Sequence, residues 1–335
     1  MRTIYAALDR RLVVVQGDGE DWTAHERLPA TDLECVAASP AAPERAFVGT
    51  AAEGLHRTTD GGAAWTIVGD FAERGEAVTS LLVSPHDPTT VYAGTEPSRV
   101  YRSTDAGETW TEREGLREVP SSARWSFPPD PETSHVRWIA EAPDEPGRLY
   151  VAVEAGAFLR SPDGGETWLD HPEGARRDVH SIATHPDAPD CVYVAAGDGY
   201  AESHDGGHTW QHPQKELHHR YVWSVAVDPG DPERVLVSAA AGARTAHVPS
   251  RAETYVYRRE GRTDDAAWTV AMEGLEPADG LARPVLATDG TAGRFYAATN
   301  RGLFRSEDAG DTWERLPAGP QAVYTDQVPA GLVIV

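Results

Sequence analysis

The stretch RSPDGGETW, residues Arg160–Trp168, recurs along this chain and is the strongest indication of its fold. Four other copies read RTTDGGAAW, RSTDAGETW, ESHDGGHTW and RSEDAGDTW, and two weaker copies, QGDGEDW and EGRTDDAAW, fill the gaps between them. The copies end at Trp22, Trp65, Trp110, Trp168, Trp210, Trp268 and Trp313, at intervals of 43, 45, 58, 42, 58 and 45 residues. A period in the forties is typical of propeller blades.

Each of these units has the same internal order. A short apolar run such as VTSLLVSP is followed in five units by a Pro-x-x-Pro turn and then by a run such as TVYAGT. A third run ends in the repeated box, and a fourth begins at its tryptophan. The runs are rich in β-branched and aromatic residues and are bounded by Gly, Pro and Asp, as strands are. The pattern predicts an all-β, seven-bladed β-propeller with four antiparallel strands per blade.

The two ends of the chain are expected to share one blade, so that residues 1–335 form a single propeller domain. The N-terminus supplies TIYAALD, RLVVVQG and the strand at Trp22, and the C-terminus supplies QAVYTDQV and GLVIV. Closing the ring in this way removes open sheet edges. These are five possible strands for a blade of four, and the sequence does not show which four of them form it.

The repeated box falls between the third and fourth strands, where a hairpin turn is needed. Its Ser or Thr and its Asp can bond to backbone N–H groups of the turn, and the Gly two residues after the Asp suits a positive φ. The Trp can cover the hairpin with a large apolar ring. Because the same residues recur in unit after unit, we interpret the box as architecture rather than as a catalytic loop. Calcium binding is disfavoured, since one Asp per turn supplies too few oxygen ligands.

The pattern Ser-x-Asp-x-Gly-x-Thr-Trp resembles the Asp-box, or BNR repeat, of the sialidase-like propellers, and the resemblance extends over the chain. That group includes sialidases, xyloglucanases, the sortilin ectodomain and the photosystem II assembly factor, and in it the box is a structural hairpin. Seven units resemble the xyloglucanase, sortilin and assembly-factor branch rather than the six-bladed sialidases. The Phe/Tyr-Arg-Ile-Pro motif of sialidases is missing here, so the resemblance transfers no catalytic residue.

The composition limits the partners and the location. The formal net charge of −23 disfavours nucleic acid as a partner. Lys215 is the only lysine, and such acid-rich, lysine-poor chains resemble the proteins of salt-in halophiles. No apolar run of membrane-spanning length and no secretory signal are recognised, so we expect a cytoplasmic protein of a high-salt cell. Cys35 and Cys191 are too few for a disulfide or metal framework and are expected to be buried free thiols.

Two connections are much longer than their counterparts in the other units, and they account for both 58-residue intervals. They are REGLREVPSSARWSFPPDPETSHVRW, which leads into the fourth unit, and AAAGARTAHVPSRAETY within the sixth. Long loops on a rigid scaffold are favoured sites of binding and catalysis. Three tryptophans outside the boxes, Trp125, Trp138 and Trp223, lie in or beside these regions, and we expect them near one mouth of the channel.

Alignment of the innermost strands gives the candidate ligand site. One column of the alignment is uniformly aliphatic, whereas two positions earlier the side chains differ in every unit: Glu34, Thr79, Arg137, His180, Trp223 and Arg283. A polar or aromatic column that changes from blade to blade is expected at a wet channel mouth that binds a ligand. The candidate ligand-binding residues are Glu34, Trp125, Arg137, Trp138, His180, His218, His219, Tyr221, Trp223 and Arg283.

Two classes of function remain open. The first is a non-catalytic propeller that binds a peptide or a small molecule. The second is a carbohydrate-active enzyme: a hydrolase would need two carboxylates among Glu34, Glu76, Glu96, Glu154, Asp178 and Asp198, and a uronate lyase could use His180, Tyr221 and Arg137. No cofactor and no definite metal site is predicted, although His135, His180, His218 and His219 could bind a metal. The sequence makes no prediction of the oligomeric state.

Overall fold

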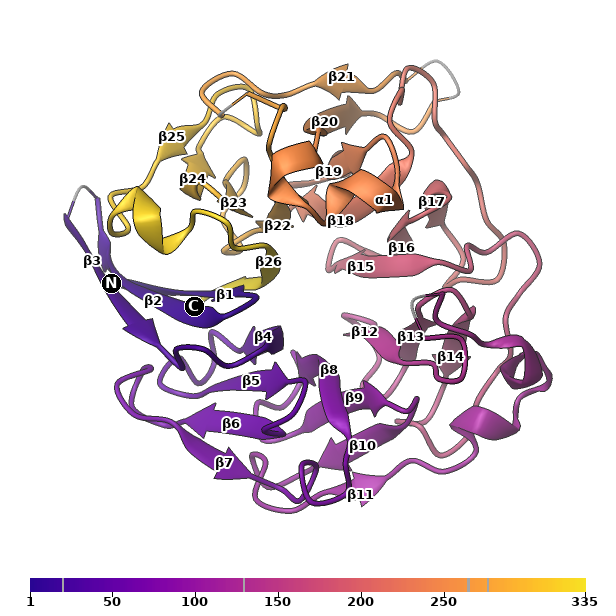
Figure 1. Ribbon diagram of the computed structural model, residues 1–335. Helices are drawn as coiled ribbons and strands as arrows, with labels where there is room; N and C mark the ends of the chain where they lie inside the picture. Colours follow the sequence, from indigo (N-terminus) through magenta and orange to yellow (C-terminus); the bar gives the residue numbers. More distant parts are fainter. Residues whose placement is uncertain (20, 129, 264–265, 276) are drawn as a thin grey trace. The chain divides into compact units, whose positions relative to one another are not determined.

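The fold is a seven-bladed β-propeller, as the repeat predicts. The computed structural model describes residues 1–19, 21–128, 130–263, 266–275 and 277–335, and within these ranges the strands form seven sheets (Figure 1). Five sheets have four strands and two have three. Among the described residues, helix is limited to one turn of α-helix and four short 3-10 segments.

By the contacts among its residues, the chain divides into two compact units. The central unit contains Thr31–Val194 and Ala201–Gln211, and the terminal unit contains Met1–Ala30, Ala195–Tyr200 and His212–Val335. Each unit is described by itself below. The single domain expected over residues 1–335 stays a prediction.

The sheets that begin in the central unit follow one another along the chain, each with its innermost strand first. The first contains β4 (Leu33–Ala38), β5 (Ala46–Thr50), β6 (Leu55–Thr58) and β7 (Thr66–Val68), and the second contains β8 (Ala77–Val83), β9 (Val91–Glu96), β10 (Val100–Ser103) and β11 (Thr111–Glu112). The three-stranded sheets contain β12 (Val136–Glu141), β13 (Leu149–Val153) and β14 (Ala157–Ser161), and β15 (Val179–His185), β16 (Ala188–Ala196) and β17 (Gly199–Ser203). The 3-10 segments η1 (Leu116–Glu118) and η2 (Pro120–Arg124) lie in the first long loop.

The terminal unit holds the remaining three sheets. They contain β18 (Tyr221–Asp228), β19 (Asp231–Ala240), β20 (Thr254–Glu260) and β21 (Thr269–Val270); β22 (Val285–Ala287), β23 (Phe295–Thr299), β24 (Gly302–Ser306) and β25 (Glu314–Arg315); and β1 (Arg2–Leu8), β2 (Arg11–Asp18), β3 (Asp21–Arg27) and β26 (Pro329–Ile334). The second long loop forms α1 (Ala243–Ala246) and η3 (Pro249–Arg251), and η4 (Gln321–Val323) precedes the last strand.

The two ends of the chain meet in one sheet, whose order is β26-β1-β2-β3 (Figure 1). One run proposed for this blade, QAVYTDQV at residues 321–328, is not a strand. It forms η4 and a loop, because β1 is already paired with β26 on one side and with β2 on the other. Tyr324 in this segment is buried instead, and its hydroxyl donates to the carbonyl of Ala318 (2.7 Å).

Two blades depart from the four strands that the repeat predicts. Their fourth strands are reduced to the single bridges Arg160–Leu169 and Glu202–Gln211. Pro172 and Pro213 follow these bridges within three residues. Because proline has no N–H to donate to a ladder, the pairing does not extend further.

The repeated box forms a hydrogen-bonded turn between the third and fourth strands, which confirms its structural interpretation. The Ser161 hydroxyl donates to Asp163 (3.0 Å) and accepts from the N–H of Gly165 (2.8 Å). Asp163 also accepts from the N–H and the hydroxyl of Thr167 (2.8 and 2.7 Å). The same backbone bonds recur in the boxes of Asp60, Asp105, Asp205 and Asp308.

Three boxes are also hydrogen-bonded to the blade that precedes them in the same unit. In each case an arginine on the third strand of that blade donates to a backbone carbonyl in the next box: Arg57 to Ala106 (3.0 Å), Arg160 to Gly206 (3.4 Å) and Arg258 to Ala309 (3.2 Å). The Gly two residues after the Asp of the box packs against the same neighbouring blade. A Cβ built on Gly107 would lie 2.6 Å from the Phe47 ring, and one on Gly310 would lie 2.7 Å from the Leu236 side chain.

The apolar core lies between consecutive sheets rather than at one centre. In the central unit, Phe47 and Leu55 of one sheet pack with Val78, Val91 and Tyr101 of the next. In the terminal unit, Leu236 and Val256 pack with Phe295, Phe304 and Trp313 in the same way. The burial of these apolar side chains therefore depends on the distance between neighbouring sheets, which the contacts of the box fix.

We predict that Gly107→Ala lowers the free energy of unfolding by about 2 to 4 kcal/mol, because the new methyl group meets Phe47 at a residue whose φ is +84°. The control is Gly75→Ala, at φ +71° with no atom within 4 Å of the new Cβ, so it carries backbone strain alone. Urea unfolding followed by tryptophan fluorescence measures both. Equal losses in the two variants would show that close packing of the box is unimportant.

Candidate functional site

At four of its six positions, the variable column of the innermost strands coincides with a β-bulge. In the central unit, the innermost strands lie side by side in the order β4, β8, β12 and β15. The first three each shift register by one residue against their second strand, and the extra residues are Glu34, Thr79 and Arg137. In the terminal unit, β18 has the same shift at Trp223. A bulge turns the extra side chain away from the ladder, which is why this column escapes the uniform packing of its neighbours.

Most of this column is buried and not solvated. Arg137 is 8 % exposed, His180 1 % and Trp223 5 %, whereas Glu34 and Arg283 are half-buried. Most side chains of the column are therefore packed among neighbouring residues, and its assignment as a ligand site stays a prediction. A buried polar side chain must be compensated by partners, so its neighbours decide what it can do.

Glu154 is the centre of a charged cluster in the central unit. It follows β13 and is buried, with 8 % of the residue exposed. Its Oε2 atom is 3.0 Å from Nε2 of His135, with which it is hydrogen-bonded, and 3.6 Å from Nε of Arg137. Burial by itself would raise the pKa of Glu154, but the hydrogen bond to His135 and the charges of His180 and Arg137 outweigh it and lower the pKa to about 2.

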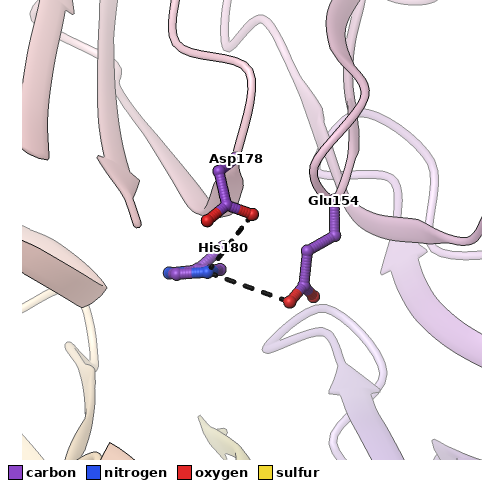
Figure 2. A group of neighbouring side chains, drawn as sticks. All are labelled: Glu154, Asp178 and His180. Carbon is purple, nitrogen blue, oxygen red and sulfur yellow. Dashed lines mark ion pairs between the residues drawn. The ribbon is translucent and has the colours of Figure 1, made fainter. Parts of the chain in front are cut away.

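His180 lies on the other side of this carboxylate, together with Asp178. Figure 2 shows the His180 ring facing both carboxylates, with Nε2 3.9 Å from Glu154 Oε1 and 3.8 Å from Asp178 Oδ1. One potential ligand atom of each residue lies within 4.8 Å of the other two. Asp178 is half-buried and also accepts a hydrogen bond from the N–H of Ala155 (3.1 Å). The three residues are adjacent in space although β13 and β15 belong to different sheets.

The first long loop covers this cluster. Phe127 packs edge-on against the ring of His135, with 4.6 Å between ring centroids. Trp125 lies over the turn after β13, where a Cβ on Gly156 would be 3.0 Å from the indole ring. The indole N–H donates to the Ser121 hydroxyl (3.1 Å). The loop thus limits the contact of the charged groups with water. Trp138, in β12 next to Arg137, is half-buried.

The terminal unit contains a separate aromatic cluster around Trp223. Tyr221 is stacked at 6.2 Å from Trp223, and its hydroxyl is hydrogen-bonded to Nε2 of His247 (2.7 Å). The guanidinium of Arg283 lies 4.0 Å from the centroid of the Trp223 ring. In this cation–π contact, the positive charge of Arg283 lies over one face of the Trp223 ring.

His218 and His219 do not belong to this aromatic cluster as their proximity in sequence to Tyr221 suggested. The His218 side chain is 70 % exposed and pairs with Glu216. His219 is stacked on Tyr255 at 4.4 Å and is hydrogen-bonded to the hydroxyl of Tyr257 (2.6 Å), both on β20. Four histidines were considered as metal ligands. Within the described residues, His180 is the one that lies in a group with two other possible ligands, Glu154 and Asp178.

Sequence reasoning missed His247 and Phe127. Both lie in the long loops, where loop length marked the segments but no motif marked the residues. The pairing of Glu154 with Asp178 was also missed, because the two belong to different sheets. Of the other acidic candidates, Glu76 is buried and accepts from the hydroxyl of Tyr101 (2.9 Å), and Asp198 is exposed.

Both cysteines are free, as expected. Cys191 is buried, and Cys35 is half-buried with its thiol 3.5 Å from the carbonyl of Val78. Burial raises the pKa of the Cys35 thiol well above its ordinary range, and the Glu34 carboxylate raises it further. Such a thiol is a weak nucleophile at neutral pH.

The comparisons with known proteins agree with this fold. The BNR/Asp-box repeat model matches residues 101–112. No curated protein matches the chain. In the part of the chain that the structure describes, no helix is both long and apolar enough to cross a membrane.

Three solved structures are similar to the chain over most of its length. An ancestral GH74 enzyme has a TM-score of 0.66 at 18% identity, with 84% of this chain and 38% of that chain covered. The GH74 xyloglucanase from Xanthomonas campestris has a TM-score of 0.65 at 15% identity, with coverages of 93% and 52%. YCF48 bound to D1 peptide has a TM-score of 0.58 at 18% identity, with coverages of 85% and 82%. The chain therefore spans about half, or less, of these two GH74 enzymes, and the likeness shows the fold.

We predict that Glu154→Gln lowers the free energy of unfolding by about 3 kcal/mol at neutral pH, because it removes the charge that compensates the buried Arg137. Urea unfolding provides the measurement. Glu73→Gln, at an exposed position of the same unit, should change the value by less than about 0.5 kcal/mol. A loss as small as that of the control would mean that the cluster contributes little to stability.

We predict that Trp223→Ala lowers the free energy of unfolding by about 3 to 5 kcal/mol, since it removes a buried ring on which Tyr221, His247 and Arg283 pack. Trp223→Phe should cost less because it keeps an aromatic face. Ile67→Ala, at a side chain that is 60% exposed, is the control. If thermal melting of Trp223→Ala matched that of the control, Trp223 would be a surface residue and not part of the core.

Proposed function

We propose that this protein is a non-catalytic binding propeller whose ligand is an extended peptide. The observation that carries the proposal is the set of bulges in β4, β8 and β12 of the central unit. On a scaffold of repeated units, the side chains at these bulges differ from blade to blade: Glu34, Thr79 and Arg137. Glu34 is half-buried and is the one of the three that a ligand can contact, whereas Thr79 and Arg137 are buried. A peptide, whose side chains differ from residue to residue, suits a site whose chemistry changes from blade to blade better than a ligand with one repeated chemical group does.

The similarity to YCF48 supports this proposal over the alternative. This chain corresponds to 82% of the YCF48 chain, whose structure holds a bound peptide, but to only 38% of the ancestral GH74 enzyme. The YCF48 structure that this chain resembles is thus one in which a propeller is seen with a peptide bound.

The second candidate function is a carbohydrate-active enzyme, which the similarity to GH74 structures favours. Hydrolysis of a glycosidic bond requires a carboxylic acid that is protonated near neutral pH, together with a second carboxylate. Glu154 and Asp178 are close enough to be considered as such a pair. Glu154 is unsuited to the role of acid, because its contacts with His135 and Arg137 keep it ionised, and the same contacts occupy its Oε2 atom.

The test is a screen of fluorescein-labelled decapeptide pools by fluorescence anisotropy, at low and at high salt. We expect some pools to bind the unmodified protein, and Glu34→Gln to weaken their binding at least 10-fold, because Glu34 is half-buried at its bulge and within reach of a ligand. Glu73→Gln removes the same charge from an exposed position outside the bulges and should bind as the unmodified protein does.

Three results would overturn the proposal. The first is that no pool binds, and the second is that Glu34→Gln and Glu73→Gln bind equally well. The third is the release of shorter products from xyloglucan oligosaccharides, detected by mass spectrometry, in amounts that increase with protein concentration. That result would establish the carbohydrate-active alternative instead.

A further inference from the structure

We propose that Glu154, Asp178 and His180 form a binding site for a divalent transition-metal ion. The site does not depend on the peptide-binding function proposed above. It stands on the positions of three side chains that two different sheets bring together, as Figure 2 shows.

The distances from the His180 nitrogen to the two carboxylate oxygens suit ligands of one metal ion and are too long for hydrogen bonds. Nε2 of His180 is 3.9 Å from Glu154 Oε1 and 3.8 Å from Asp178 Oδ1, and both distances are too long for a hydrogen bond. Two ligands that each lie about 2.1 Å from one ion are at most about 4.2 Å apart. An ion between His180 and either carboxylate would therefore have ordinary bond lengths without large movement of the chain.

The surrounding residues orient these ligands. Glu154 is held through Oε2 by His135 and Arg137, so its Oε1 atom is the one that faces His180. Asp178 is held by the N–H of Ala155. Hydrogen bonds of this kind to metal-bound carboxylates fix the direction of their lone pairs in known sites. His180 is almost fully buried, which fixes its ring against both carboxylates.

Charge also favours a cation at this position. The carboxylates of Glu154 and Asp178 lie within 4.8 Å of each other, so a cation placed between them would be attracted by both. The nearby Arg137 compensates only part of this charge. One imidazole nitrogen and two carboxylate oxygens suit Mn²⁺, Fe²⁺, Co²⁺ or Zn²⁺ better than Ca²⁺ or Mg²⁺, which prefer oxygen ligands alone.

A different arrangement could account for the same cluster without a metal. A protonated His180 would itself be the cation between the two carboxylates. The two arrangements differ in their response to added metal, since only the first provides a saturable site that depends on Asp178.

The experiment is a titration of chelator-stripped protein with Co²⁺, followed by visible absorption and by the metal content after desalting. We expect one Co²⁺ per chain, displaced by Zn²⁺. Asp178→Asn and His180→Ala should each weaken binding at least about 100-fold, because each removes a protein ligand. Circular dichroism checks that the variants are folded. Asp178→Asn is the decisive variant, because Asp178 is half-buried and Asn keeps an acceptor for the N–H of Ala155.

The matched control is His218→Ala, which removes an exposed histidine that is paired with an acidic residue, Glu216. It should bind Co²⁺ with the same affinity and the same spectrum as the unmodified protein. The proposal is overturned if the stripped protein binds no stoichiometric Co²⁺. It is also overturned if a folded Asp178→Asn variant binds Co²⁺ as tightly as the control does.

Discussion

Several Asp-boxes are hydrogen-bonded to the blade before them, and this contact sets the spacing of neighbouring sheets within each unit. Within a box, the Asp and the Ser or Thr use their oxygens to satisfy the backbone N–H groups of a tight turn. Carbonyl groups of the turn are not used within the box, and arginines of the preceding blade, such as Arg57 and Arg258, donate hydrogen bonds to them. The apolar core is made between sheets, so a turn that fixes the distance between sheets also fixes the core.

Such a scaffold leaves the innermost strands free to vary. Stability comes from the hairpins and from the layers between sheets, which repeat, while the bulged residue of β4, β8, β12 or β18 can change without affecting the ladder. In the central unit the bulge of β12 places Arg137 beside Glu154, where His180 of β15 also lies. In the terminal unit the bulge of β18 places Trp223 beneath Arg283. In the first cluster charge is compensated by charge, and in the second a cation is compensated by an aromatic face.

Burial of the charged cluster in the central unit has an energetic cost that packing alone does not offset. A carboxylate as enclosed as Glu154 is stable only because His135 and Arg137 compensate it, and an isolated buried charge would be neutralised instead. Proteins commonly place such costly groups at sites that bind or react, although ion-pair networks with a purely structural role also occur. The long loop that brings Phe127 onto His135 adds to the enclosure and is absent from the other blades of this unit.

The blade number, the strand order and the role of the box could be predicted from the sequence, because they follow from local chemistry that repeats: turn residues at fixed offsets and apolar runs at a fixed period. The alignment of units also placed Arg137, His180 and Trp223 in a column that differs from blade to blade. The surroundings of these residues could be seen only in the folded chain. Glu154 and His180 are 26 positions apart and belong to different sheets, and His218 and His219, next to Tyr221 in sequence, pack elsewhere. Which side chains meet depends on the direction in which each bulge and long loop points, and that direction is set by packing between sheets, which has no signature in a single strand.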